Sequence, residues 1–210
     1  MNHPQEGNAK LLASALLNLA AAALSAVGTA IAFGKYGAAM FALYTVDSNL
    51  LAMLACTAYA VFLIRRLVCG REVPVWSVMA KYTAVCCLSV TFLVVVAVLA
   101  PGGGRDGYRQ MLLSGDMLYH HLFCPVLAVL SFFLFDRVPC RAGKAARCAL
   151  LPTVLYAVVL VVLNLTRTVT GPYPFLRVYA QPLWASALWI VGILGGAWLL
   201  AWLLARLRRR

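Results

Sequence analysis

Six long apolar segments dominate this sequence and constrain its fold more than any other feature. Each is close to the ~20 residues that an α-helix needs to cross the hydrocarbon core of a bilayer. Only 11% of the residues are charged and 64% are hydrophobic, whereas a soluble domain carries roughly 25% charged residues. We therefore predict an all-α polytopic membrane protein: a single domain over residues 1–210, formed by a bundle of six transmembrane helices at about 11–33, 41–64, 78–100, 117–135, 147–165 and 183–205.

The basic residues are divided unequally between the two sides of such a bundle. Six spans place both termini and the second and fourth loops on one side, which then holds 13 Lys and Arg, while the other side holds five. Positive charge is enriched in cytoplasmic loops, so we predict cytoplasmic N- and C-termini in the plasma membrane. This placement accounts for the net charge of +12. We interpret the basic C-terminal run 206–210 as a topological anchor that also contacts anionic lipid. We expect membrane lipids as partners and no nucleic acid; the oligomeric state is left open.

A polar cluster lies at the start of the second apolar segment, in Thr45-Val46-Asp47-Ser48-Asn49. Polar side chains in lipid cost free energy unless they are paired, so the cluster requires neighbours or a wet cavity. On a helix, Thr45, Ser48 and Asn49 share one face while Asp47 turns toward a flank. The predicted topology places the cluster in the outer half of the membrane.

Further polar residues are assigned to the same depth. The fourth span begins near Asp116, His120 and His121, and Pro125 removes the hydrogen bond that the His121 carbonyl would accept, which predicts a kink there. If the second, fourth and fifth spans touch, one outer pocket is enclosed, and no comparable set is expected in the inner half. Ser14 and Asn18, spaced four apart on the first span, are expected to serve helix packing. The pocket candidates are Thr45, Asp47, Ser48, Asn49, Asp116, His120, His121, Tyr156, Asn164, Arg167 and Tyr173.

These residue types suit ester hydrolysis. A threonine hydroxyl becomes nucleophilic when a base takes its proton, and histidine has a suitable pKa for that role. Ser48, Asn49 or Asn164 could donate hydrogen bonds to a developing oxyanion. Asp47 or Asp116 could orient the imidazole, as the third member of a catalytic triad does.

Three alternatives use the same residues. A zinc site would use His120, His121, Asp116 and Asp47, but adjacent histidines point about 100° apart on a helix and do not chelate as an i, i+4 pair would; we expect neither a metal nor a cofactor. In a purely structural alternative, Asp47 pairs with Arg167 and the histidines satisfy carbonyls that the kink exposes. A non-catalytic protein could instead bind a lipid or small ligand in this pocket.

Three motifs together resemble a known family: Thr45-Val46-Asp47-Ser48-Asn49-Leu50, His121-Leu122-Phe123-Cys124-Pro125 and Pro172-Tyr173-Pro174-Phe175-Leu176. Their order and spacing resemble the bacterial six-span "Pr-six-Pr" membrane proteins, which are more distantly similar to the animal androgen-induced and androgen-dependent TFPI-regulating proteins. The animal members hydrolyse fatty acid esters of hydroxy fatty acids with a threonine nucleophile and a histidine.

The resemblance implies a membrane hydrolase of lipid esters, a serine-hydrolase-like esterase with Thr45 as nucleophile, His121 as base and His120 as a helper. Two departures from the family pattern bear on this reading: Asp47 stands where an uncharged residue is usual, and Arg177 where an acidic one often occurs. A catalytic role requires the Thr45 hydroxyl within hydrogen-bond reach of a His121 nitrogen.

Overall fold

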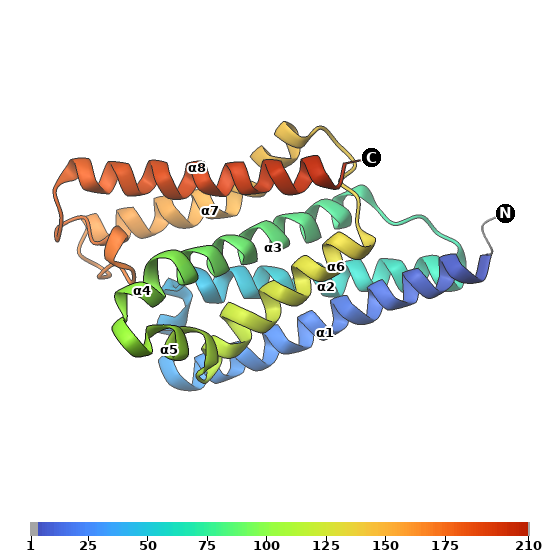
Figure 1. The fold of residues 1–210 in the computed structure, drawn as a ribbon, viewed down its shortest axis with the longest axis horizontal. Helices are drawn as coiled ribbons and strands as arrows, with labels where there is room; N and C mark the ends of the chain where they lie inside the picture. Colours follow the sequence, from blue (N-terminus) through green and yellow to red (C-terminus); the bar gives the residue numbers. More distant parts are fainter. Residues whose placement is uncertain (1–3, 210) are drawn as a thin grey trace.

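The protein is a bundle of long helices (Figure 1), seen in a computed structural model that describes residues 4–209. Six helical segments of the described chain are long and apolar enough to cross a membrane, which confirms the predicted fold class. The long elements are α1 (Pro4–Tyr36), α2 (Tyr44–Cys69), α3 (Val75–Val94), α6 (Cys124–Phe135), α7 (Ala142–Leu165) and α8 (Leu183–Leu207). Short elements are η1 (Gly37–Ala42), η2 (Val95–Leu99), α4 (Ala100–Gly102), η3 (Gly104–Asp106), α5 (Gly107–Leu113), η4 (Leu118–Phe123) and η5 (Pro174–Leu176).

Helix α3 forms the centre of the bundle and contacts α2, α6, α7 and α8. Its buried residues lie on most sides of the helix, as expected of a helix with neighbours all round. Helix α1 packs along α2 and α6, and α8 packs along α7. Both chain ends lie at the same end of the bundle, and the short elements α4 and α5 lie at the other (Figure 1).

Small residues let α1 approach its neighbours closely. Ala15, Ala21, Ser25 and Ala32 are buried along one side of this helix, and small side chains favour close helix packing where lipid replaces water. Gly28 belongs to the same set: a Cβ there would lie 2.8 Å from the ring of His120. The absence of a side chain at this position makes room for the imidazole.

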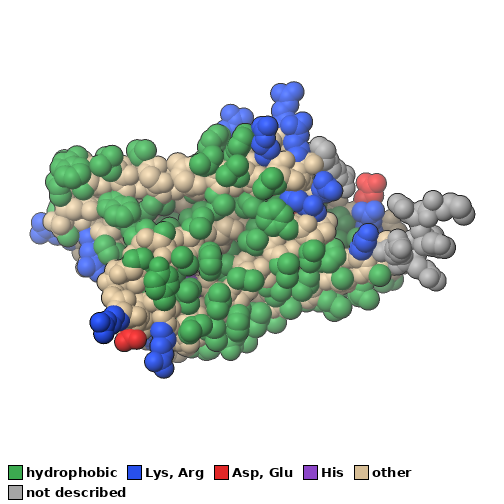
Figure 2. All heavy atoms as spheres, in the orientation of Figure 1, with side chains coloured by type: hydrophobic (Ala, Val, Ile, Leu, Met, Phe, Trp, Pro, Cys, Tyr) green, Lys and Arg blue, Asp and Glu red, His purple; other side chains and the backbone are tan. Residues whose placement is uncertain are grey.

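The outer surface is apolar over most of its length. Figure 2 shows hydrophobic side chains across the middle of one face, with Lys and Arg gathered toward the two ends. Large hydrophobic residues such as Leu183 and Val68 are 83% and 78% exposed. This distribution suits a bundle whose sides contact lipid and whose ends contact water.

A buried polar cluster at the end that holds the termini corrects one expectation. Lys81 Nζ lies 2.5 Å from Asp136 Oδ2 and donates to Ser131 Oγ at 2.8 Å, and Tyr59 donates to the other Asp136 oxygen at 3.0 Å. Asn18 Nδ2 reaches Ser131 Oγ at 3.3 Å. The prediction that the inner half holds no comparable polar set is therefore wrong, and Lys81 is a core residue instead of a loop cation.

Candidate functional site

The side chains of Thr45 and His121 meet at the end of the bundle opposite the termini. Thr45 Oγ1 lies 3.1 Å from His121 Nε2, and the two residues are 8% and 3% exposed. Thr45 is the second residue of α2, and His121 lies in η4 at the start of the fourth span. The two residues that the sequence pairs as nucleophile and base are thus in hydrogen-bond contact.

A hydrogen bond of the second ring nitrogen, Nδ1, determines which nitrogen of His121 carries the proton. His121 Nδ1 lies 2.7 Å from the Met111 carbonyl oxygen, which can only accept a hydrogen bond, so Nδ1 carries the hydrogen. Nε2 of the neutral ring then presents its lone pair to the Thr45 hydroxyl. The Met111 carbonyl thus takes the orienting role that was expected of Asp47 or Asp116.

An irregular helical segment places the histidines. Residues Leu118–Phe123 form a π-helix, and the Cys124 N–H bonds to the Tyr119 carbonyl five residues earlier. Pro125 follows directly and offers no N–H to the His121 carbonyl, so the helix is irregular at the place where a kink was predicted. The wider turn sets the direction in which His121 projects, and such segments occur frequently at functional sites.

Two polar neighbours of Thr45 hold its backbone instead of facing a substrate. Ser48 Oγ bonds to the Thr45 carbonyl at 3.0 Å and to Thr91 Oγ1 at 3.0 Å. Asn49 Nδ2 donates to the Thr45 carbonyl at 2.8 Å and to the His120 carbonyl at 3.3 Å. Because these contacts occupy their donors, neither is available for an oxyanion, and Asn49 connects the nucleophile turn with the histidine segment.

The single polar pocket expected if the second, fourth and fifth spans touch is not formed, because the candidate residues line different cavities. Thr45, His121, Asp116 and Tyr173 line one cavity of about 360 Å³. Asp47, Ser48 and Tyr156 line a second between α2 and α7, and Asn164 and Arg167 line a third at the loop that follows α7.

Asp47 and Arg167 line different cavities, and the ion pair between them that the structural alternative invoked is not among those of the described residues. The Arg167 guanidinium lies over the Tyr179 ring, 4.9 Å from its centroid. Asn164 donates to the Val169 carbonyl at 3.2 Å and accepts from the Val178 N–H at 3.0 Å. These contacts fold the loop after α7, and they place Asn164 away from Thr45.

His120 and Asp116 lie beside the pair without contacting Thr45 through a hydrogen bond. His120 is fully buried against α1, with Nε2 3.5 Å from Thr29 Oγ1. Asp116 is buried and lies 3.5 Å from Lys35 Nζ. Among residues 7–209, whose side chains the structure describes, no three His, Cys, Asp or Glu side chains gather closely enough to hold a metal ion.

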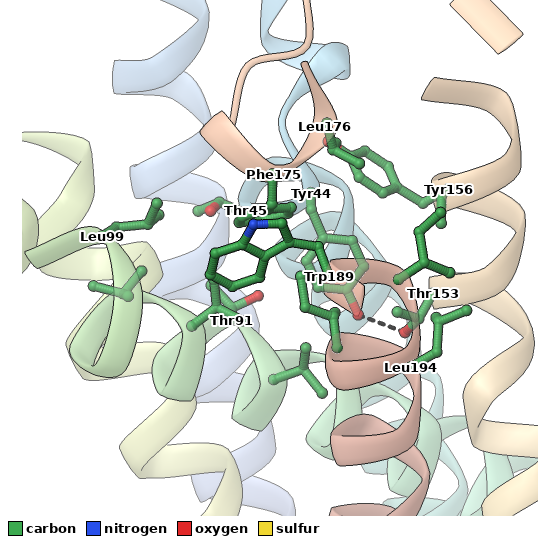
Figure 3. A pocket seen from close by; sticks show the side chains of 16 residues that line it. Tyr44, Thr45, Thr91, Leu99, Thr153, Tyr156, Phe175, Leu176, Trp189 and Leu194 are labelled. Atoms are coloured by element: carbon green, nitrogen blue, oxygen red, sulfur yellow. Dashed lines mark hydrogen bonds between the residues drawn. The ribbon is translucent and has the colours of Figure 1, made fainter. Parts of the chain in front are cut away.

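A narrow apolar pocket meets the site cavity at Thr45 (Figure 3). It holds about 60 Å³ and extends between α2, α3, α7 and α8. Figure 3 shows Trp189 and Phe175 over it and Tyr44 hydrogen-bonded to Thr153. Tyr156 donates to the Ala42 carbonyl at 2.8 Å and stands edge to face with Tyr44. Thr45 is therefore reached from two sides, one apolar and one that includes His121.

Two participants were not assigned roles from the sequence. Met111 contributes a backbone carbonyl, and since every residue has one, the residue type carries no signal for this role. Tyr173 reaches Thr45 from the Pro-rich loop, with its phenol oxygen 3.5 Å from Thr45 Oγ1; the sequence indicated it as a pocket residue only. Comparison of the chain with protein-family models, curated proteins and solved structures found no match.

Proposed function

We propose that this protein is a membrane-embedded hydrolase of lipid esters, with Thr45 as nucleophile and His121 as general base. The observation that carries the proposal is the 3.1 Å contact between Thr45 Oγ1 and His121 Nε2, in a ring whose other nitrogen is held by the Met111 carbonyl. A hydroxyl, an oriented neutral imidazole and an adjoining cavity are the elements that acyl transfer requires.

The proposed reaction has two acyl-transfer steps. His121 Nε2 takes the Thr45 proton while Oγ1 bonds to the ester carbonyl carbon, whose π electrons move to the carbonyl oxygen. The intermediate collapses, the bond to the alcohol oxygen breaks, and His121 returns the proton to that oxygen. His121 then takes a proton from water, whose oxygen attacks the carbonyl carbon of acyl-Thr45; the bond to Oγ1 breaks, His121 returns the proton to Oγ1, and the carboxylic acid is released.

The two cavities at Thr45 support a lipid ester as substrate. The apolar pocket suits a short apolar group of the ester, since its lining is almost entirely aliphatic and aromatic. The larger cavity beside His121 is more polar and includes Asp116 and Tyr173, which suits the alcohol portion and the attacking water. The three motifs resemble the bacterial six-span "Pr-six-Pr" proteins and, more distantly, animal threonine hydrolases of fatty acid esters, and this resemblance adds to the proposal.

We further propose that the termini are cytoplasmic and that the site faces the outer leaflet of the plasma membrane. Membrane lipids are then its surroundings and the source of its substrate. The unequal division of Lys and Arg between the two ends supports this orientation even when the buried Lys81 is left out of the count.

Fluorophosphonate labelling of the purified full-length protein tests the proposal. Wild type is expected to be labelled at Thr45, and Thr45→Val and His121→Gln to lose labelling while remaining folded. Thr153→Val is the matched control, because Thr153 is a buried threonine of the same apolar pocket whose hydroxyl bonds to Tyr44 and to no histidine. Equal labelling of wild type and Thr45→Val would contradict the assignment, and co-purified intact lipid without turnover would favour a lipid-binding protein.

A further inference from the structure

Tyr173 approaches the nucleophile from the loop between α7 and α8. Its phenol oxygen lies 3.5 Å from Thr45 Oγ1 and accepts a hydrogen bond from the Thr45 backbone N–H at 3.4 Å. Its ring stacks on Phe175, with centroids 5.2 Å apart and planes 14° apart. One phenol therefore contacts both the reacting oxygen and the backbone of the nucleophile.

The Thr45 N–H is one of the donors that a helix start leaves without an intrahelical partner. The next two residues of α2, Val46 and Asp47, both donate to the Leu43 carbonyl, whereas the Thr45 N–H points to the Tyr173 phenol. It also lies at the positive end of the α2 dipole, where negative charge is stabilised. This N–H is a second donor beside the reaction centre, and its present acceptor is the phenol oxygen instead of a backbone carbonyl.

We propose that Tyr173 is a catalytic residue: its phenol and the Thr45 N–H together bind the carbonyl oxygen of the ester as that oxygen becomes negative. This assignment rests on the hydrolase function proposed above. The new oxyanion is bonded to the same carbon as Thr45 Oγ1, which the phenol already contacts, and the Thr45 N–H turns to the oxyanion from the phenol oxygen that it now binds. The side-chain donors expected for this role, those of Ser48 and Asn49, are occupied by backbone carbonyls.

The loop presents the phenol in a fixed position and a suitable protonation state. Pro172 and Pro174 flank Tyr173 and restrict the backbone on both sides. The loop closes tightly at Gly171, where a Cβ would lie 2.7 Å from the Leu176 carbonyl oxygen. Burial raises the pKa of the Tyr173 phenol, so the hydroxyl keeps its proton at neutral pH and serves as a donor. A donor held in place before the reaction is what makes such stabilisation effective.

Tyr173 transfers no proton in this scheme. The Thr45 proton moves to His121 and then to the leaving alcohol, and the phenol only donates a hydrogen bond that strengthens as charge develops. Removing one such donor lowers kcat by ~10²–10³-fold in hydrolases with comparable sites. We expect the same order of loss for Tyr173→Phe, with little change in KM.

A thionoester experiment separates catalysis from a structural role. Hydrolysis of p-nitrophenyl butyrate and of its thiono analogue, in which sulfur replaces the carbonyl oxygen, is measured for wild type and Tyr173→Phe. Because sulfur accepts hydrogen bonds poorly, we expect the oxygen-to-sulfur rate ratio to fall in Tyr173→Phe. Both rates come from one preparation, so partial loss of folded protein cancels in the ratio.

The matched control is Tyr179→Phe. It removes another phenol of the same loop, one that donates to the Leu165 carbonyl at 2.7 Å. Its ratio is expected to equal that of wild type. An unchanged ratio in Tyr173→Phe would overturn the role of Tyr173 while leaving Thr45 as nucleophile. Turnover that survives Thr45→Val would instead contradict Thr45 as the nucleophile, and absence of turnover in wild type would contradict the hydrolase, so these failures are distinguishable.

Discussion

The ion pair between Lys81 and Asp136 allows a stability prediction of known sign. Both side chains are removed from solvent, at 1% and 3% exposure, so each charge depends on the other. Substituting Lys81→Met leaves the Asp136 carboxylate with the Tyr59 phenol as its side-chain donor. Substituting Asp136→Leu leaves the ammonium with Ser131 Oγ and the face of the Tyr59 ring.

We expect each single substitution to lower the free energy of unfolding by about 3–5 kcal/mol, since breaking a buried pair strands one charge. The double variant Lys81→Met/Asp136→Leu removes both charges and is expected to lie within about 1 kcal/mol of wild type, because replacing a buried pair by apolar residues is often neutral. The resulting coupling energy is about 5 kcal/mol or more, the sum of two single losses less the small loss of the double variant.

Unfolding in mixed micelles of rising dodecyl sulfate fraction, followed by tryptophan fluorescence, measures these differences. Fluorophosphonate labelling per folded molecule is expected to stay unchanged, because the pair lies at the opposite end of the bundle from Thr45. Single variants that lose less than about 1 kcal/mol would refute the reasoning, since that is the range of a hydrated surface pair.

Two further predictions concern the packing of His120 and the orientation of the chain in the membrane. Gly28→Ala is expected to lower stability by about 1–3 kcal/mol and to slow labelling of Thr45, because the new methyl group meets the His120 ring. The control Gly34→Ala, where a Cβ has nothing within 4 Å, is expected to show neither effect. Thermal unfolding and labelling rates measure both variants, and equal behaviour of the two would contradict the prediction. The exposed Cys69 is expected to react with a membrane-impermeant maleimide only in permeabilised cells, with Cys69→Ser as the control for other thiols. A cysteine introduced by Arg105→Cys is expected to react in intact spheroplasts. The opposite pattern would contradict the cytoplasmic placement of the termini.

The six spans could be predicted because helix length and apolarity are properties of the local sequence. The pairing of Thr45 with His121 was also accessible, since both lie near the start of spans that run in the same direction and therefore at the same depth. Their neighbours were harder to assign. Ser48 and Asn49 share a helix face with Thr45, as expected, but their side chains contact backbone carbonyls and Thr91. The spacing of residues along a helix predicts which face they share, but it does not predict what that face packs against.

The polar cluster of Lys81 and Asp136 was missed for a different reason. Lys81 lies six residues after the start of α3, about 9 Å along the helix at 1.5 Å per residue, so its charge is well inside the bundle. A lysine near a predicted span end reads as an interfacial cation, and Asp136 reads as a loop residue. Only the fold brings the C-terminal end of α6 beside the first turns of α3.

The π-helix at Leu118–Phe123 bears on how such a site arises. A π-turn is equivalent to one extra residue in an α-helix, and one residue rotates everything beyond it by about 100°. Deleting a residue from this segment would restore a regular helix and turn His121 away from Thr45 while leaving the apolar spans intact. A single-codon insertion in an ancestral membrane helix would therefore be enough to bring an imidazole to a hydroxyl that was already present.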